Sequence, residues 1–384
     1  MPVPTAETPT ATLNKPEQPA PVTTFVIPDL VKECRMELKC NPYYEEAREA
    51  AEAWFDSYKV HTGVRREEFY RAKFCLLGAL SYPNADAERL RNCCDFINWL
   101  FAFDDLTDDG DLRKNLAGTK KVAEIMVRAL EDPHNAKTDF AVGETLRDFW
   151  IRAIQTAGPG CQRRFIESTK LYLEAVYQQV VNRSENEIPD LKTFIALRRD
   201  TSAVKLVFAL IEYACDLDLP DRVASDPIII SLGDCCNDIL TWANDIYSYN
   251  LEQSWGETQN LIVVSMKDKN LSLQEGVDFV GELIRERIAC FEADKARLPS
   301  FGSEEVDADV RTYVQGLEHW VSGVIAWSFQ SKRYFGDEHL TIREKRIVTL
   351  MAKEPEAVTK QGKDVERETA AAAAAAAGPL SEAA

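Results

Sequence analysis

Residues 93–110, CCDFINWLFAFDDLTDDG, constrain the fold most, because an apolar helical face in this stretch ends in carboxylates. Phe96, Leu100, Asp104 and Asp108 are spaced four apart. Four residues advance an α-helix by about 400°, so these side chains share nearly one face. A face that is apolar enough to be buried therefore leads directly into an acidic mouth.

This acidic mouth needs cations. Asp104, Asp105, Asp108 and Asp109 place four carboxylates within six residues, and like charges held this close repel one another and shift each other's pKa. Mg²⁺ is a hard ion that prefers oxygen ligands, and proteins often hold it with one or two carboxylates while substrate phosphates complete the octahedron. The stretch therefore predicts a magnesium site.

A second helix, predicted over PIIISLGDCCNDILTWANDIYSYNLEQSWGE, repeats this construction. After Leu232, Cys236 and Leu240, its column continues with three oxygen-bearing residues, Asn244, Ser248 and Glu252. An amide, a hydroxyl and a carboxylate one turn apart can converge on one hard divalent ion. A solvated polar helix end would explain one such column equally well, but two columns of the same kind favour a metal site.

A third pattern lies near the C-terminus. Trp320, Trp327 and Tyr334 recur every seven residues, which places the three rings on one helical face, and Arg333 adjoins the last of them. Such a stripe is typical of a packed core. It also suits a site that stabilises a transient cation, because an aromatic face attracts positive charge without offering a nucleophile.

Apolar residues repeat at three and four over most of the chain, and alternating β-branched runs are scarce, so the predicted fold class is all-α. We expect a helix break at 82–84 and a kink at 198–202, where a polar patch interrupts an apolar helix.

The formal charge of −18 and the lack of a basic stripe argue against a nucleic-acid partner. The ten cysteines include no CxxC pair, which favours buried thiols in a reducing compartment.

The composition divides the chain into three parts. Residues 1–23 are rich in Pro, Thr and Ala and are expected to be a disordered tail, residues 24–350 to form one helical domain, and residues 351–384, with alanines at 370–377, to be a low-complexity tail. We see neither a signal sequence nor an apolar run long enough to span a bilayer. We therefore expect a cytoplasmic protein without a stable membrane anchor.

Two rival sites fit the sequence less well. Residues 105–110 match the first half of an EF-hand loop, but the twelfth position is Leu116 where that loop needs a bidentate glutamate. The four histidines lack the HExxH spacing of a zinc protease and the G-x-S-x-G partner of a serine hydrolase. Neither a calcium loop nor a hydrolytic triad is therefore predicted.

The motifs resemble those of the class I terpene cyclases, specifically the fungal and bacterial sesquiterpene synthases, over about residues 25–335. DDLTDD is similar to the family's aspartate-rich motif, and NDIYSYNLE matches its N-D-x-x-S-x-x-x-E motif. RRDTS stands where the family keeps a diphosphate-sensing arginine, and RYF resembles its terminal Arg-Tyr pair. The resemblance implies a single-domain helical bundle of the class I terpenoid synthase type, with a central apolar cavity.

The resemblance also implies a role for each matching residue. The expected metal ligands for three Mg²⁺ ions are Asp104, Asn244, Ser248 and Glu252. The expected diphosphate contacts are Arg198, chosen over Arg199 by its spacing to Asn244, together with Arg333 and Tyr334. The aromatic residues expected to line the pocket are Phe101, Trp320 and Trp327.

Four residues at three sites depart from the family pattern. Leu251 stands where a Lys or Arg commonly contacts phosphate, and Ser202 and Ala203 occupy the kink where relatives have a glycine. Ser81 stands where some relatives carry a pocket aromatic, which would widen the cavity.

The resemblance implies a Mg²⁺-dependent sesquiterpene synthase that ionises and cyclises farnesyl diphosphate and releases diphosphate. One alternative is a chain-elongating prenyl diphosphate synthase, although such enzymes carry a second aspartate-rich motif where this chain has Asn244 and Ser248. The other is a catalytically silent helical protein that binds metal or prenyl ligands. The expected partner is a small-molecule prenyl diphosphate, and the expected state is a monomer or homodimer.

Overall fold

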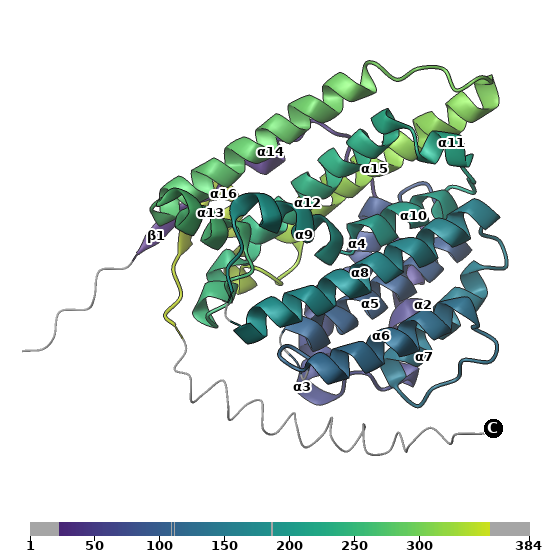
Figure 1. The fold of residues 1–384 in the computed structure, drawn as a ribbon, viewed down its shortest axis with the longest axis horizontal. Coiled ribbons are helices and arrows are strands. Elements are labelled where there is room, and N and C mark those ends of the chain that lie inside the picture. Colours follow the sequence, from purple (N-terminus) through teal and green to yellow (C-terminus); the bar gives the residue numbers. More distant parts are fainter. Residues whose placement is uncertain (1–22, 109, 111, 186, 354–384) are drawn as a thin grey trace, which may run out of the picture.

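The computed structural model describes residues 23–108, 110, 112–185 and 187–353, and within these the protein is almost wholly helical (Figure 1). The all-α prediction is therefore confirmed. The helices are α1 Leu30–Glu33, α2 Tyr44–Ser57, α3 Gly63–Arg71, α4 Phe74–Ser81, α5 Ala87–Asp108, α6 Leu116–Glu131, α7 Ala141–Ala153, α8 Pro159–Glu185, α9 Leu191–Thr201, α10 Val204–Ala214, α11 Asp221–Ala224, α12 Pro227–Ser254, α13 Leu261–Lys269, α14 Leu273–Lys295, α15 Glu304–Gln330 and α16 His339–Lys345, with a 3₁₀ turn at Gly336–Glu338.

Two short strands were not predicted. β1 (Thr24–Val26) pairs antiparallel with β2 (Ile347–Thr349), and the central residues Phe25 and Val348 are both buried. Beyond β2, the Met351 N–H donates to the Asn250 side chain at 2.8 Å. The sheet thus ties the two ends of the described region together, and the hydrogen bond of Met351 lies one residue past the predicted end of the domain at residue 350. The rest of both predicted tails, except Thr23, Ala352 and Lys353, lies outside the described residues.

Helix α5 carries the aspartate-rich stretch and is held by aromatic packing. It contacts α2, α4 and α7, and its Phe96 ring lies 5.1 Å from Phe149 on α7 and 5.3 Å from Phe165 on α8, centroid to centroid. All three rings are fully buried. Truncating such a ring to alanine typically costs about 3–5 kcal/mol, so the N-terminal part of α5 is a rigid base for its acidic end.

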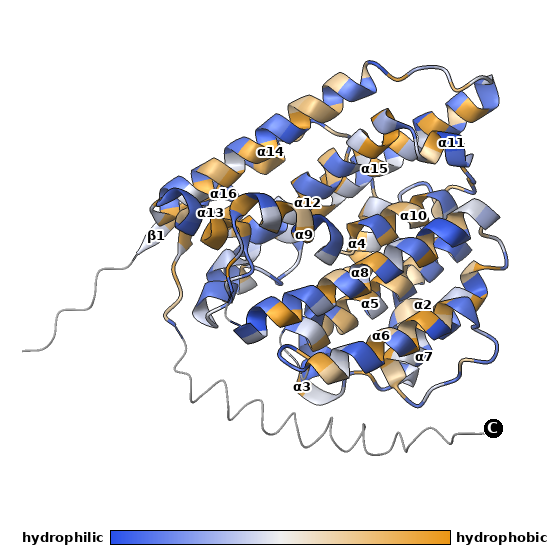
Figure 2. Ribbon diagram, viewed as in Figure 1, coloured by the Kyte–Doolittle hydropathy of each residue, from blue (hydrophilic) through white to orange (hydrophobic). Residues whose placement is uncertain are grey.

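Helix α12 carries the second column and is surrounded by other helices. It begins with Pro227 in its first turn, where proline lacks only an N–H that the helix would leave unpaired, and the Asp226 carboxylate caps the Ile228 N–H at 2.9 Å. Helices α13, α14 and α15 pack against it. In Figure 2, hydrophobic and hydrophilic residues alternate along α14, as expected of a helix with one buried face.

The predicted chain breaks are present, and one more occurs. The break at 82–84 separates α4 from α5, and the expected kink is a complete break between α9 and α10. Lys73, with φ of 52°, adds a left-handed residue between α3 and α4. Periodicity did not reveal this break because apolar residues continue on both sides of it.

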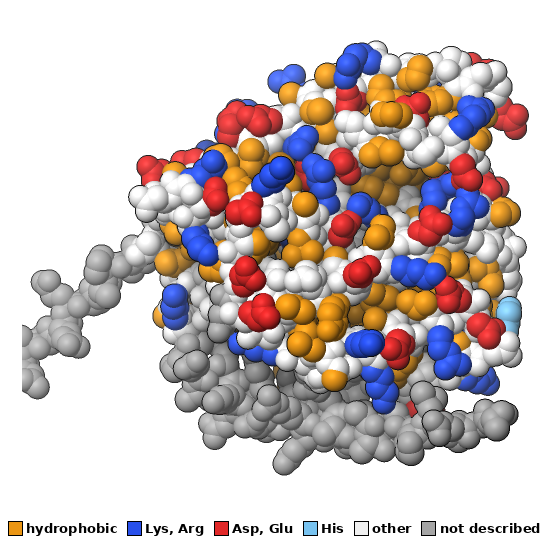
Figure 3. Space-filling view, in the orientation of Figure 1, with side chains coloured by type: hydrophobic (Ala, Val, Ile, Leu, Met, Phe, Trp, Pro, Cys, Tyr) orange, Lys and Arg blue, Asp and Glu red, His pale blue; other side chains and the backbone are white. Residues whose placement is uncertain are grey.

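Three features of the described residues concern the surface charge, the apolar character of the helices and the state of the cysteines. Positive and negative side chains are interspersed over the face in Figure 3, so this face carries no continuous basic stripe. None of the helices that the structure describes combines the length and apolar character needed to cross a bilayer. All ten cysteines are free thiols.

His61 gives the fold a predicted acid sensitivity. Its ring is buried beside Phe69, 4.7 Å between centroids. Burial, aided by Arg65, lowers the His61 pKa from 6.5 to about 4. Between pH 6.5 and pH 4, His61 is protonated in the unfolded chain but stays neutral in the folded protein. The contribution of the neutral, buried ring to stability is therefore present above pH 6.5 and is lost as the pH falls to 4. The free energy of unfolding is expected to fall by up to about 1.4 kcal/mol per pH unit over this range.

The comparison is urea unfolding of wild type and His61→Phe between pH 4 and 7. The variant is expected to lose this part of the pH dependence, while His134→Gln, which changes an exposed histidine, keeps it. Identical slopes for wild type and His61→Phe would contradict the prediction.

Candidate active site

The acidic end of α5 and the polar end of α12 meet through two adjacent residues that follow α15. Arg333 Nη2 lies 3.4 Å from Asp104 Oδ2, and the Asn244 Nδ2 amide donates to the Tyr334 hydroxyl at 2.9 Å. The structure therefore brings together residues from positions 104, 244 and 333–334. We call the four predicted ligands, Asp104, Asn244, Ser248 and Glu252, the ligand rim.

The two neighbouring arginines of α9 have different environments. Arg198 Nη2 donates to Asn244 Oδ1 and to Asp245 Oδ1, both at 2.8 Å. Arg199 instead forms a two-point ion pair with the buried Asp238 carboxylate, at 2.7 and 2.6 Å. Arg198 thus touches the ligand rim, whereas Arg199 joins α9 to the middle of α12.

The donor set on α12 suits a hard cation. Ser248 is 7% exposed, and its hydroxyl makes no hydrogen bond of ordinary geometry to any described residue. Burial and the nearby Asp245 carboxylate raise the pKa of Glu252 to about 7. A cation at this position would use the unpaired hydroxyl and remove the cost of the buried negative charge, and oxygen donors of this kind are those that Mg²⁺ prefers.

The aspartates of α5 differ in their surroundings. Burial, and then Asp108, raise the pKa of Asp104, while Arg333 opposes the rise. Asp108 is paired with Arg183 at 2.6 Å, so its charge is already compensated by the protein. Asp109 lies outside the described residues. Of Asp104 and Asp108, Asp104 therefore has the longer contact to a cationic side chain, 3.4 Å to Arg333.

A buried ion-pair network behind Asp108 was missed by the sequence analysis. Arg183, 4% exposed in its side chain, donates to the Thr107 carbonyl at 3.0 Å and lies 3.2 Å from Glu257 Oε2. Arg113 contacts the same oxygen at 3.0 Å. This network joins the end of α5 to the loop after α12. It has no sequence signature, because Arg183 stands near the end of a long polar helix among other charged residues.

Asn260 is a second residue that the pattern did not reveal. It is fully buried, and its Nδ2 amide donates to the Asp245 carbonyl at 2.8 Å and to Glu252 Oε2 at 2.9 Å. Its Oδ1 caps α13 through the Ile262 N–H. The side chain therefore orients the Glu252 carboxylate and fixes the start of α13 beside α12.

The predicted aromatics separate into two groups. Phe101 stacks on Phe74 with 3.9 Å between centroids and lies 5.8 Å from Trp327, and the Arg333 guanidinium sits 4.8 Å from the Phe101 centroid. Trp320 instead packs edge-on against Tyr82 at 5.3 Å. Phe101 and Trp327 thus adjoin Arg333, whereas Trp320 lies about two turns away along α15.

The Phe101 group also contains Phe74, which the sequence analysis did not single out. Trp327 is buried and donates its indole N–H to the Ala72 carbonyl at 2.7 Å. Ser81, the position expected to widen the cavity, is buried where α4 meets α15, and its hydroxyl would lie 3.0 Å from a Cβ added at Gly323. A hollow of about 400 Å³ beside Asp190 and Asp268, and one of about 10 Å³ beside Ser81, lie among the described residues. Neither is lined by the ligand rim, so the apolar cavity beneath it stays a prediction.

The break after α9 holds a strained residue. Ala203 has a φ of 57°, a left-handed conformation that disfavours a residue with a Cβ. The segment is fixed by Asn237 of α12, whose Nδ2 donates to the Arg199 carbonyl at 2.8 Å and whose Oδ1 lies 3.0 Å from the Ser202 hydroxyl. The structure thus forms this break without a glycine.

Replacing Ala203 by glycine is expected to stabilise the protein by about 1 kcal/mol, because glycine adopts this conformation without steric cost. Urea unfolding measures the change. Ala209→Gly, in the middle of α10, is the control and is expected to destabilise the protein by about 1 kcal/mol or more. Equal losses in the two variants would show that Ala203 is not strained.

The chain is similar to known proteins over most of its length. Residues 95–289 match the family model described as terpene synthase family 2, C-terminal metal binding. Sesquiterpene synthase 1 of Postia placenta is 42% identical over 338 residues, which cover 88% of this chain and 98% of that protein. Sesquiterpene synthase Agr1 of Cyclocybe aegerita is 41% identical, over 90% of this chain and 98% of that protein. The crystal structure of germacradien-4-ol synthase from Streptomyces citricolor superposes with a TM-score of 0.69 at 21% identity, over 77% of this chain and 96% of that one.

Proposed function

The chain belongs to the terpene synthase family and is a sesquiterpene synthase, and we propose that its substrate is farnesyl diphosphate, held by three Mg²⁺ ions at the ligand rim. The observation that carries the proposal is the link from Asp104 through Arg333 and Tyr334 to Asn244. Through this link, possible metal-ligating oxygens from α5 and α12 lie around the hydrogen-bond donors of Arg333 and Tyr334. This arrangement suits a diphosphate group.

Diphosphate leaves a carbon atom readily only when its developing negative charge is stabilised. Bound Mg²⁺ would supply most of that stabilisation as a Lewis acid. Arg198, Arg333 and Tyr334 add hydrogen-bond donors at fixed positions. Burial lowers the pKa of both arginines, but nearby carboxylates raise it by more, so the net shift is upward. An arginine side chain is cationic at neutral pH even without such a shift.

Departure of diphosphate leaves an allylic carbocation, which the aromatic group beside Arg333 is placed to stabilise. Phe101 and Trp327 present ring faces without a nucleophilic atom, and such faces attract a cation by about 1–2 kcal/mol when water is excluded. Trp320 would act further along α15. Product identity would follow from the shape of the space that these rings line, since a dry apolar site delays quenching by water.

The domain that performs this chemistry is proposed to be residues 24–350. The strand pair supports this assignment, because β1 and β2 join residues 24–26 to residues 347–349. The tails at 1–23 and 351–384 are proposed to be dispensable for catalysis, and the protein is proposed to act in the cytoplasm as a monomer or homodimer.

The test is to incubate the full chain with Mg²⁺ and, separately, with C10, C15 and C20 prenyl diphosphates. We expect release of diphosphate and a volatile cyclic C15 hydrocarbon from farnesyl diphosphate, detected by gas chromatography with mass detection. Addition of EDTA should abolish both. Neither diphosphate nor hydrocarbon from any substrate would overturn the proposal, and a longer prenyl diphosphate after adding isopentenyl diphosphate would indicate chain elongation instead.

A further inference from the structure

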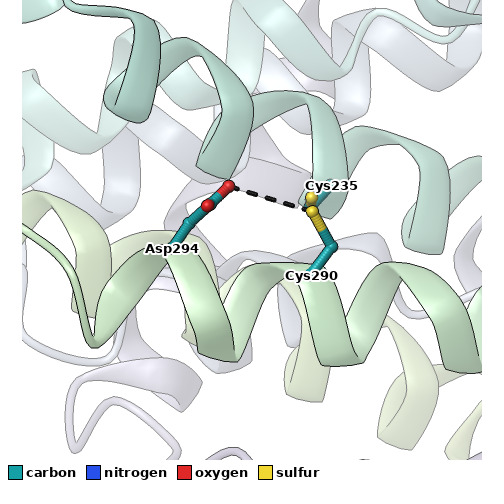
Figure 4. Close-up of side chains that lie close together, drawn as sticks. All are labelled: Cys235, Cys290 and Asp294. Atoms are coloured by element: carbon teal, nitrogen blue, oxygen red, sulfur yellow. Dashed lines mark hydrogen bonds between the residues drawn. The ribbon is translucent and has the colours of Figure 1, made fainter.

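A second group of metal-binding side chains lies between α12 and α14 (Figure 4). Cys235 projects from α12, and Cys290 and Asp294 project from α14. The two sulfurs and a carboxylate oxygen all lie within 4.8 Å of one another. We call these three residues the thiol–carboxylate cluster.

The cluster is built from two pairs of residues on facing helices. Cys290 and Asp294 are four apart on α14, as are Ser231 and Cys235 on α12, so each pair lies on one helical face. The Ser231 hydroxyl donates to Asp294 Oδ2 at 2.6 Å, and Cys290 Sγ lies 3.8 Å from the same oxygen. Cys235 meets Cys290 one turn away. The pairs therefore face each other in antiparallel order.

These distances and atom types fit one ion of a particular class. Zn²⁺ and similar cations bind thiolate and carboxylate ligands tetrahedrally, and metal–sulfur bonds of about 2.3 Å place two ligand atoms roughly 3.5–3.8 Å apart. Ser231 would hold the ligating carboxylate in place, as hydrogen bonds around metal sites commonly do. Mg²⁺ has little affinity for sulfur.

The surroundings of the thiol–carboxylate cluster allow a metal ion to enter and keep the net charge unchanged when it binds. Cys235 is 1% exposed, whereas Cys290 is only partly buried and gives an ion a route from solvent. Asp294 is already paired with Arg297. Binding of M²⁺ to two thiols forms two metal–sulfur bonds and releases two protons, so the net charge of the cluster is the same before and after loading.

We propose that Cys235, Cys290 and Asp294 form a second metal site that binds a thiophilic divalent cation, Zn²⁺ by its ligand chemistry, with water at the fourth position. This site is separate from the ligand rim. Cys235 and Asn244 are nine residues apart on α12, about 13 Å along the helix axis. A bound ion would tie α12 to α14 and stabilise the helix that carries the rim.

Cobalt titration distinguishes this site from the oxygen-rich rim, because only thiolate ligands give a near-ultraviolet sulfur-to-cobalt charge-transfer band. The full chain is kept in excess Mg²⁺ with a phosphine reductant, so that the thiols stay reduced and the rim is filled. We expect the band to saturate at one Co²⁺ per chain. In Cys235→Ser and Cys290→Ser, Co²⁺ binding should weaken by at least about 100-fold.

Cys215→Ser is the matched control, since Cys215 is partly buried like Cys290 but directly follows α10. It should bind Co²⁺ as wild type does. Zn²⁺ should raise the melting temperature by about 3 °C in wild type and Cys215→Ser and leave Cys290→Ser unchanged. If Cys235→Ser does not fold, the Co²⁺ binding of Cys290→Ser alone decides whether the site exists. Absence of the band in wild type, or an undiminished band in Cys290→Ser, would overturn this site and leave the proposed synthase activity untouched.

Discussion

Replacing Asn244 by alanine is expected to lower kcat/KM for farnesyl diphosphate by about 1,000-fold. The Asn244 amide joins α12 to α9 and to the segment after α15, since Oδ1 accepts from Arg198 and Nδ2 donates to Tyr334. Its removal takes away a proposed metal ligand and releases two of the proposed diphosphate donors. Initial rates of diphosphate release, measured over a range of Mg²⁺ concentrations, give the effect.

The matched control for this variant is Asn250→Ala. Asn250 lies on the same helix, but its side chain holds the chain after β2, through the Thr349 carbonyl at 2.9 Å and the Met351 N–H at 2.8 Å. Its loss is expected to cost about 1 kcal/mol of stability and to leave kcat within a few-fold of wild type. Unchanged turnover in Asn244→Ala would exclude Asn244 as a ligand, whereas equal loss in both variants would indicate a general effect on α12.

Replacing Arg183 by methionine is expected to destabilise the protein by about 3–5 kcal/mol, the largest effect on stability among the substitutions discussed. Methionine fills similar space but leaves the Glu257 carboxylate, 8% exposed, without its buried partner. Asp108 is 44% exposed, so water can solvate its carboxylate after the Arg183 partner is removed. The cost in stability therefore arises mainly at Glu257. Urea unfolding of the metal-free protein measures the change.

Two variants separate charge from packing. Arg113→Met removes the other partner of Glu257 while Arg183 remains, and is expected to cost only about 1 kcal/mol. In the double variant Arg183→Met, Glu257→Gln, part of the loss should be recovered, because the uncompensated charge is gone and the amide oxygen can still accept from the Thr258 and Gln259 N–H groups. A double variant less stable than Arg183→Met would show that the buried charge is not the cause.

The helical pattern predicted the elements of this site better than it predicted the site's connections. Phe96 and Leu100 are apolar and precede Asp104 and Asp108 on α5, and the same order recurs on α12, so both columns were visible as local periodicity. The aromatic stripe was only partly informative. Trp320 and Trp327 share a face of α15, but Trp320 packs against Tyr82, just after α4, and Trp327 packs against Phe101 on α5.

Local sequence was enough to predict features that depend on neighbours within a few residues: the all-α class, the helix break at 82–84, a kink at 198–202 and the two columns of oxygen donors. Which distant groups meet follows from tertiary packing. It pairs Asp104 with Arg333 across 229 residues, sends Arg198 and Arg199 to different carboxylates, and buries Arg183 against Glu257. The physical reason is that helical periodicity fixes the face on which a side chain lies, whereas its partner depends on how whole helices pack.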